Sequence, residues 1–309
     1  MPESLSSDDL RDLAQSWAVT LRGQRKSANT VAVYLRSLEQ YLTFCDAIAA
    51  EPLRKRTLDA FLADLADRGR SGTTARSRLT GVRQFVRWLL IEDELDVDPF
   101  AGVKPPTVDT KVIEPLTAAQ IKAMLATCST PKGAAKDRKF RDVRDAALIR
   151  LMVETGLRAG EVLGIEVGDM RHREDHPFLI VRKAKSRRGR TVPFSGEAGV
   201  AVDRYMRARR HHALADSPAL WLGARKNHLN YSGLYDTLTE RAERAGIGGF
   251  HPHLMRHTAA HRWLAAGGSE GGLMAVAGWS RPDMLMRYTA ARAEDRAAAE
   301  ARGLNLGEL

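Results

Sequence analysis

The sequence has only two cysteines and no long apolar run, and each absence excludes a class of protein. Cys45 and Cys128 lie far apart and do not form the spacing of a metal site, which indicates a protein of a reducing, cytosolic compartment. No stretch reaches the ~18 uncharged apolar residues of a membrane-spanning helix. Residues 1–9 are polar and acidic, unlike a secretory signal. We therefore expect a cytoplasmic protein without a membrane span.

Acidic residues are fewer than basic residues in the second part of the chain. The 309 residues carry 48 lysines and arginines against 38 aspartates and glutamates, a net charge of +10. Residues 1–107 hold 15 of each sign, so the whole excess falls within residues 108–309, which also hold all nine histidines. A basic domain attracts polyanions such as DNA, although a merely soluble basic protein has the same charge.

The first hundred residues predict a helical domain. On the third of its predicted helices, Arg76, Arg83 and Arg87 follow one another at i, i+7 and i+11 and therefore share one face. That face is a candidate phosphate-contacting stripe, with a solvated polar face as the alternative. The three stretches in which apolar residues recur at helical spacing are 31–44, 58–65 and 79–90.

The domain boundary is predicted at a proline-rich segment. Pro105 and Pro106 favour extended backbone, so residues 105–112 are interpreted as a linker between a helical domain at 1–104 and a second domain at 113–309.

The second domain is predicted to combine helices with a few short strands. Residues 144–157 are strongly apolar and predict a buried helix that ends at Gly156. Short strands at 178–181 and 191–194 flank a basic turn. The predicted fold class is mainly α with a small β-hairpin or sheet.

Four polar signatures follow one another in the second domain and together suggest phosphodiester chemistry. Arginine forks grip a phosphate through paired hydrogen bonds, a tyrosine can attack phosphorus, and a lysine can protonate the oxygen that leaves. The signatures are Thr155-Gly156-Leu157-Arg158-Ala159-Gly160-Glu161, Lys185 ahead of Arg190-Thr191-Val192-Pro193, His253-Leu254-Met255-Arg256-His257, and Tyr288.

In order and local context these signatures resemble the tyrosine recombinase, or phage integrase, family, whose members cut and rejoin DNA through a phosphotyrosine bond. The resemblance covers nearly the whole chain. It implies a helical core-binding domain followed by a catalytic domain. The catalytic roles that it implies fall on Arg158, Lys185, His253, Arg256, Trp279 and Tyr288.

Two of these assignments depend on counting along the family pattern. Lys185 matches the catalytic lysine because it lies eight residues before Pro193, and Lys183 is the alternative. Tyr288 matches the nucleophile because it follows Trp279 by nine residues. Most relatives have histidine where this chain has Trp279, and tryptophan keeps a single N–H donor but cannot shuttle protons.

Glu161 and His257 are predicted to hold the catalytic side chains in place without contacting DNA themselves. Glu161 could brace an active-site arginine or histidine, or act as an ordinary acid at a helix N-terminus. His257 is predicted to pack inside as a satisfied polar residue. A metal site is an alternative interpretation of these histidines, because His253, His257 and His261 lie at i, i+4 and i+8. No cysteine or acid completes that set nearby, so neither a metal nor another cofactor is expected.

The remaining basic residues are predicted to hold the DNA backbone. They are the helical stripe and the basic turn: Arg76, Arg83, Arg87, Lys183, Arg187, Arg188 and Arg190. The resemblance implies duplex DNA with inverted-repeat core sites as the partner, and a homotetramer on that DNA.

The predicted function is site-specific recombination through a 3′-phosphotyrosine, by an integrase of a phage or mobile element. A Xer-type resolvase of chromosome or plasmid dimers is the alternative. A DNA-binding accessory protein without catalysis is less favoured, because the set of arginines, lysine, histidine and tyrosine is intact. The helical domain begins almost at residue 1, which leaves little room for the additional arm-binding domain of many integrases.

Overall fold

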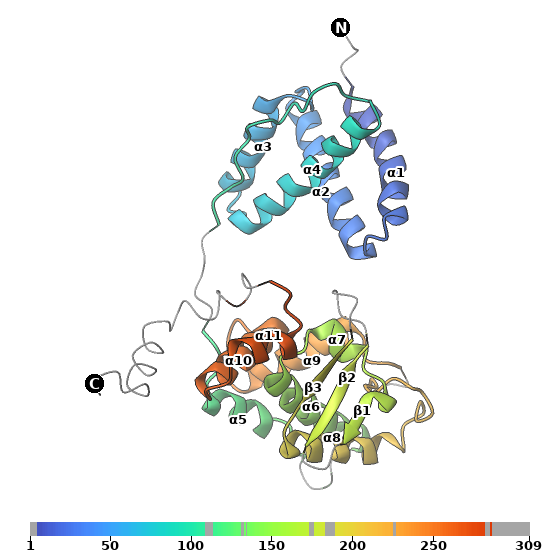
Figure 1. The fold of residues 1–309 in the computed structure, drawn as a ribbon, viewed down its shortest axis with the longest axis vertical. Coiled ribbons are helices and arrows are strands. Elements are labelled where there is room, and N and C mark those ends of the chain that lie inside the picture. Colours follow the sequence, from blue (N-terminus) through green and yellow to red (C-terminus); the bar gives the residue numbers. More distant parts are fainter. Residues whose placement is uncertain are drawn as a thin grey trace, which may run out of the picture. The chain divides into compact units, whose positions relative to one another are not determined.

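The computed structural model describes residues 5–108, 114–130, 133, 135–172, 176–182, 189–224, 227–281 and 285. The chain divides into two compact units, Met1–Lys111 and Val112–Leu309. The first unit is helical, and the second combines helices with a small sheet (Figure 1). Within the described part of the chain, no helix is both long enough and apolar enough to cross a membrane.

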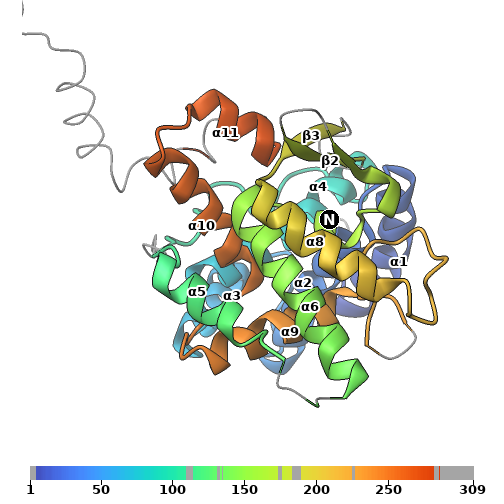
Figure 2. The same cartoon turned by 90° about the horizontal axis from the view of Figure 1, so that it is seen from below.

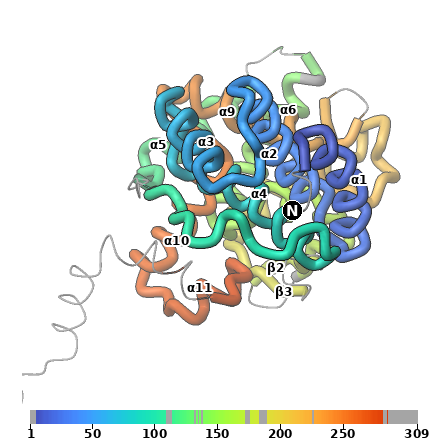
Figure 3. Tube along the Cα trace, turned by 90° about the horizontal axis from the view of Figure 1, so that it is seen from above, coloured from blue at the N-terminus to red at the C-terminus, as the bar shows by residue number. Residues whose placement is uncertain are grey.

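The first unit is a bundle in which α2 and α4 pack against each other and α1 and α3 flank them (Figure 3). Aromatic rings fill its core: Trp17 lies 5.1 Å from Phe85 and Tyr41 lies 5.3 Å from Phe61, measured between ring centroids. The helices are α1 (Ser7–Gly23), α2 (Ala28–Ala47), α3 (Lys55–Asp67) and α4 (Gly72–Ile91).

Three of these helices were predicted from apolar spacing, and the structure confirms them. The additional helix α1 begins at a capping box, in which Ser6 and Asp9 each bond the other's backbone N–H. Its apolar residues Leu10, Leu13, Trp17 and Leu21 recur at helical spacing and face the core, so α1 has the same kind of sequence signal as the three predicted helices.

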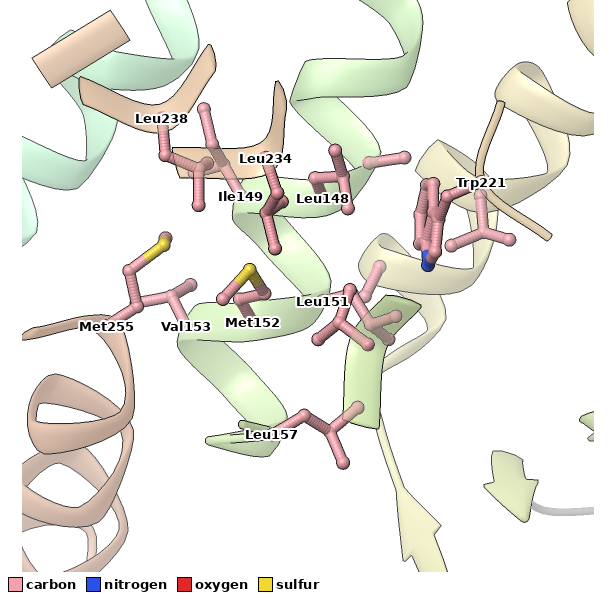
Figure 4. Packing of buried hydrophobic residues seen from close by; sticks show 14 of the residues in the cluster. Leu148, Ile149, Leu151, Met152, Val153, Leu157, Trp221, Leu234, Leu238 and Met255 are labelled. Atoms are coloured by element: carbon pink, nitrogen blue, oxygen red, sulfur yellow. The ribbon is translucent and has the colours of Figure 1, made fainter. Parts of the chain in front are cut away.

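The second unit is built around α6 (Lys136–Thr155), which has α8 along one side and α10 along another (Figure 2). Its middle turns are buried all round, as the run of apolar residues predicted. Leu148, Leu151 and Met152 are fully enclosed, with Leu234 of α9 and Met255 of α10 among their neighbours (Figure 4). The other helices of this unit are α5 (Ala118–Ala126), α7 (Ala159–Leu163), α8 (Gly196–Arg209), α9 (Tyr231–Arg244), α10 (Pro252–Ala265) and α11 (Glu270–Ala277), with a short 3₁₀ turn η1 (Val167–Asp169).

The sheet has three antiparallel strands in the order β1-β2-β3. Leu179 lies opposite Val192, and Val181 lies opposite Arg190. The two predicted strands are confirmed, and a third, which was not predicted individually, pairs along the other edge of β2. The strands are β1 (Met170–His172), β2 (Pro177–Val181) and β3 (Arg190–Pro193). The predicted class, mainly α with a small sheet, is confirmed.

A buried ion network fixes α6 against α9. The Arg241 guanidinium donates to Asp142 at 2.7 Å and to Asp145 at 2.6 Å, and Arg144 also binds Asp145, at 2.7 Å. All four side chains are almost completely buried. Because buried charges are costly without partners, removal of any one of these side chains would leave an uncompensated charge between the two helices.

Candidate active site

The site begins where α6 ends, at Gly156. This residue has φ +61°, a left-handed conformation that favours glycine, and its N–H closes the last turn onto the Met152 carbonyl. A side chain here would also meet a neighbour, since a Cβ atom would lie 3.2 Å from the Cβ of Ala259. The predicted helix end at Gly156 is confirmed, and it turns the chain directly into Arg158.

Arg158 is held by the carboxylate of Glu161. Its backbone N–H donates to Glu161 Oε2 at 2.9 Å and its Nη1 donates to Oε1, also at 2.9 Å. The Arg158 side chain keeps 31% exposure while that of Glu161 keeps 6%. The guanidinium at the start of α7 is therefore partly exposed, while the carboxylate that binds it is buried.

Arg190, at the start of β3, binds the same carboxylate from another direction. Its Nη1 and Nη2 donate to the two oxygens of Glu161 at 3.0 and 2.8 Å, and its Nε donates to the Val276 carbonyl at 2.7 Å. Burial raises the pKa of the Glu161 carboxyl most strongly, but the hydrogen bonds and charges of Arg190 and Arg158 together outweigh it, so that this pKa is lowered. Glu161 is therefore ionised at neutral pH.

Arg256 is buried, with 2% exposure, and bridges the ends of two helices. Its Nη1 donates to the Gly156 carbonyl at 2.7 Å and its Nη2 to the Ala277 carbonyl at 2.9 Å. The guanidinium carbon lies 5.2 Å from the centroid of the Trp279 ring, a cation–π contact. Trp279 itself is buried next to α11.

His253 lies one turn before Arg256, in the first turn of α10, which begins with Pro252 as predicted. Desolvation lowers its pKa most strongly, and the positive charges of Arg256 and Arg158 are further causes among its neighbours. The ring is therefore neutral at pH 7 and able to accept a proton. Arg158, which is distant in the sequence, thus acts on His253 together with Arg256 of the same helix.

The other two histidines of α10 contact each other. His257 is buried, and its ring meets that of His261 edge-on, with 4.6 Å between centroids. Where side chains are described, no group of three or more His, Cys, Asp and Glu residues is arranged to hold a metal ion. His251, which the sequence did not single out, stacks near His253 at 6.4 Å between ring centroids.

Five predicted site residues lie outside the described residues: Lys183, Lys185, Arg187, Arg188 and Tyr288. Their roles stay predictions. The stretches on either side of the basic turn are described, and Arg182 on the β2 side binds Glu166 at 2.7 Å and also Asp169.

The predicted stripe on α4 does not present three equivalent arginines. Arg83 is half-buried and donates to the Val103 carbonyl at 2.5 Å, and Arg76 donates to the Pro106 carbonyl at 2.9 Å. Arg87 is exposed. Two of the three side chains thus hold the segment that follows the bundle, and their contact with DNA stays a prediction.

Sequence comparison identifies both units of the chain. Residues 114–295 match the model of the phage integrase family, and residues 13–95 match the model of the phage integrase N-terminal SAM-like domain. The tyrosine recombinase XerD of Corynebacterium glutamicum is 28% identical over 90% of this chain and 93% of its own length. The tyrosine recombinase XerC of Methylobacterium nodulans is 32% identical over 85% and 83% respectively.

Solved structures share the fold at low sequence identity. The XerH site-specific recombinase, in a post-cleavage complex with a palindromic difH substrate, has a TM-score of 0.73 at 16% identity, covering 96% of this chain and 84% of XerH. The Tn1549 transposon integrase, bound to circular intermediate DNA, has a TM-score of 0.69 at 19% identity, covering 93% and 98%.

Proposed function

The chain belongs to the phage integrase family of tyrosine recombinases, enzymes that break and rejoin DNA strands, and from this premise we propose that it is a site-specific recombinase acting through a 3′-phosphotyrosine. The observation that carries the proposal is the convergence of Arg158, His253 and Arg256. The guanidiniums of Arg158 and Arg256 both act on the neutral imidazole of His253: Arg158 lies at the start of α7, and His253 and Arg256 lie one turn apart on α10. This set suits a phosphate whose charge grows during attack.

In the proposed cleavage step, the Tyr288 oxygen attacks the scissile phosphorus. A bond forms between phosphorus and the tyrosine oxygen as the bond from phosphorus to the 5′-oxygen breaks. The phenolic proton passes to His253, and Lys185 donates a proton to the departing 5′-oxygen. The products are a 3′-phosphotyrosine and a 5′-hydroxyl, while Arg158 and Arg256 stabilise the charge on the non-bridging oxygens.

Rejoining reverses these transfers on a second duplex. The 5′-hydroxyl of the partner strand attacks the phosphotyrosine and gives its proton to Lys185, the bond from phosphorus to tyrosine breaks, and the phenol regains its proton from His253. Because the phosphotyrosine conserves the energy of the phosphodiester bond, the cycle uses no ATP, and because side chains supply the charge stabilisation and the proton transfers, it uses no metal. We further propose a homotetramer on two inverted-repeat sites, acting in the cytoplasm.

Two biological roles use this same chemistry. We propose an integrase of a phage or mobile element first, in line with the integrase family model. Resolution of chromosome or plasmid dimers is the second candidate, and the names XerC and XerD of the curated relatives support it. An attachment site or prophage genes beside the coding sequence would favour the first role.

The covalent intermediate gives the direct test. Wild-type protein should form a protein–DNA band on a nicked suicide substrate that carries its recombination site. Tyr288→Phe keeps the ring but lacks the attacking oxygen, so it should bind the DNA and form no band. Tyr231→Phe is the matched control, because Tyr231 is 60% exposed on α9 and should be dispensable for the covalent band. A band from Tyr288→Phe would show that another residue is the nucleophile.

A further inference from the structure

Arg190 was assigned to the DNA backbone because it belongs to a basic turn, but its guanidinium is nearly buried and bonded to acceptors of the protein. Its three nitrogens donate to Glu161 and to the Val276 carbonyl, and the side chain is 10% exposed. An arginine that binds a phosphate needs its fork directed outward. Here the fork is directed at a buried carboxylate.

That carboxylate also holds Arg158. Each oxygen of Glu161 receives one hydrogen bond from Arg190 and one from Arg158. The two arginines therefore share one negative charge, and neither forms an exclusive pair with it. Without Arg190, Glu161 would keep only its hydrogen bonds to Arg158 from this pair of arginines. Arg158 would then be drawn towards the carboxylate and away from a phosphate.

Arg190 also fixes the end of α11, which leads into Trp279. Successive carbonyls there accept from two arginines, Val276 from Arg190 and Ala277 from Arg256. Gly278 follows with φ +66°, and a Cβ atom on it would lie 2.9 Å from Arg190 Nη1 and 3.0 Å from Cζ. The guanidinium therefore packs directly against the backbone at Gly278, where the positive φ favours glycine and a side chain would displace Arg190.

We propose that Arg190 is a positioning residue: it divides the charge of Glu161 with Arg158 and fixes the Val276–Gly278 backbone, so that Arg158 and the Trp279–Arg256 pair are aligned before DNA binds. This inference rests on the proposed function. It links three elements, α7, β3 and α11, through a single side chain. It gives Arg190 no direct part in gripping DNA.

The variant Arg190→Lys distinguishes the proposed positioning role from a contact with the DNA backbone. Lysine keeps the charge, so it would largely preserve an electrostatic contact with phosphate, but it lacks the rigid fork that reaches Glu161 and Val276 together. We expect single-turnover cleavage of a saturating nicked substrate to fall on the order of 10²-fold, as for a misplaced catalytic group. The affinity for DNA, and its dependence on salt concentration, should change little.

A double substitution tests whether Arg190 acts through Glu161. Arg190→Met should slow cleavage because Glu161 then binds Arg158 alone. Adding Glu161→Gln removes the charge that retains Arg158, so the double variant should cleave no more slowly than Arg190→Met. Independent effects would instead multiply. Urea unfolding of each variant identifies losses that arise from destabilisation, and only variants that are folded at the assay temperature enter the comparison.

Arg182→Lys is the matched control on the other side of the same turn. Arg182 also binds carboxylates, those of Glu166 and Asp169, but its side chain is 51% exposed and neither partner is bonded to Arg158. We expect it to cleave at close to the wild-type rate.

The outcomes separate the two proposals. Absence of a covalent complex with wild-type protein would overturn the proposed function. Wild-type cleavage together with unimpaired Arg190→Lys would overturn the positioning role alone. So would a weaker, less salt-dependent affinity in Arg190→Met with unchanged saturated cleavage, since that pattern identifies a phosphate contact. Multiplicative losses in the double variant would also overturn it.

Discussion

Arg158 and Arg256 are held in opposite ways, although both are proposed to bind the same phosphate. Arg256 is buried, with main-chain carbonyls holding two of its nitrogens. Arg158 is partly exposed, and an ionised carboxylate holds it from behind. Carbonyl partners fix the position of a guanidinium without neutralising it, whereas the charge of Glu161 is divided between two arginines. The site therefore keeps a surplus of positive charge for an incoming phosphate.

The lowered pKa of His253 predicts the pH dependence of cleavage. The folded protein holds this pKa below the ordinary histidine value of about 6.5, so the ring is neutral at pH 7 and becomes charged only in acid. A neutral ring can accept the phenolic proton, and a charged one cannot. Single-turnover cleavage should therefore be constant near neutrality and fall as the pH drops through a midpoint below 6.5.

His253→Gln checks this assignment, because glutamine keeps a hydrogen-bonding side chain but does not titrate. Cleavage at neutral pH should fall by about 10²–10⁴-fold, the usual contribution of a general base. The acid limb should disappear from the pH profile. His211→Gln, at an exposed histidine, should leave the wild-type profile intact. An acid limb that persists in His253→Gln belongs to another group.

At the scale of elements, the site is assembled from helix ends. Gly156 ends α6 and Gly278 ends α11, both in the left-handed conformation. Arg158 follows the first end and Trp279 follows the second. Arg256 on α10 bonds both ends, through the carbonyls of Gly156 and Ala277.

Gly156→Ala should therefore disturb stability and cleavage together. A non-glycine residue in this conformation costs about 1–2 kcal/mol, and the Cβ atom would also press on Ala259. The urea midpoint should fall, and cleavage should slow because the carbonyl that holds Arg256 shifts. Gly160→Ala is the control, since Gly160 lies within α7 and a Cβ atom there meets no neighbour within 4 Å. Equal midpoints for the two variants would contradict the strain argument.

The basic turn between β2 and β3 is predicted to carry the general acid. If Lys185 protonates the departing 5′-oxygen, Lys185→Ala should be badly impaired on ordinary DNA. A 5′-bridging phosphorothiolate leaves as a stable thiolate, so cleavage of that substrate should be largely restored. Lys183→Ala should show a mild, salt-sensitive binding defect without such rescue. Rescue of Lys183→Ala in place of Lys185→Ala would exchange the two assignments.

Features that depend on local sequence were predictable. Apolar spacing gave α2, α3, α4 and the centre of α6, and the glycine after α6 gave its end. Helix α1 was also predictable, since Leu10, Leu13, Trp17 and Leu21 recur at helical spacing, whereas the three residues of β1 offered too little periodicity. The pairing of Arg190 with Glu161 could not be predicted, because the partners lie in different elements and a basic turn is typical of DNA contacts. It was necessary to know that β3 packs against α11 and that its first residue lies within reach of Glu161 on α7.

At the scale of the whole molecule, charge and chemistry are concentrated in the same part of the chain. Residues 108–309 carry the entire net charge of +10. Arg158, Arg256 and His253, which are proposed to act on the phosphate, belong to the same unit. We infer that this unit supplies most of the salt-dependent attraction for DNA, whereas the first unit, with balanced charges, contributes through shape and individual contacts.

The whole reaction is predicted to proceed without a metal ion. All of the proposed electrophilic and proton-transferring groups are side chains, namely Arg158, Arg256, His253 and Lys185. Covalent complex formation should therefore persist in excess chelator, at a rate equal to that in its absence. A preparation of Tyr288→Phe should form no complex in either buffer, which ties the signal to the nucleophile.

If chelator abolished cleavage and zinc restored it, the spacing of His253, His257 and His261 would have to be reinterpreted as a ligand set that forms when DNA is bound. Restoration by magnesium alone would instead indicate that the ion acts on the DNA, because histidine nitrogens are poor ligands for magnesium.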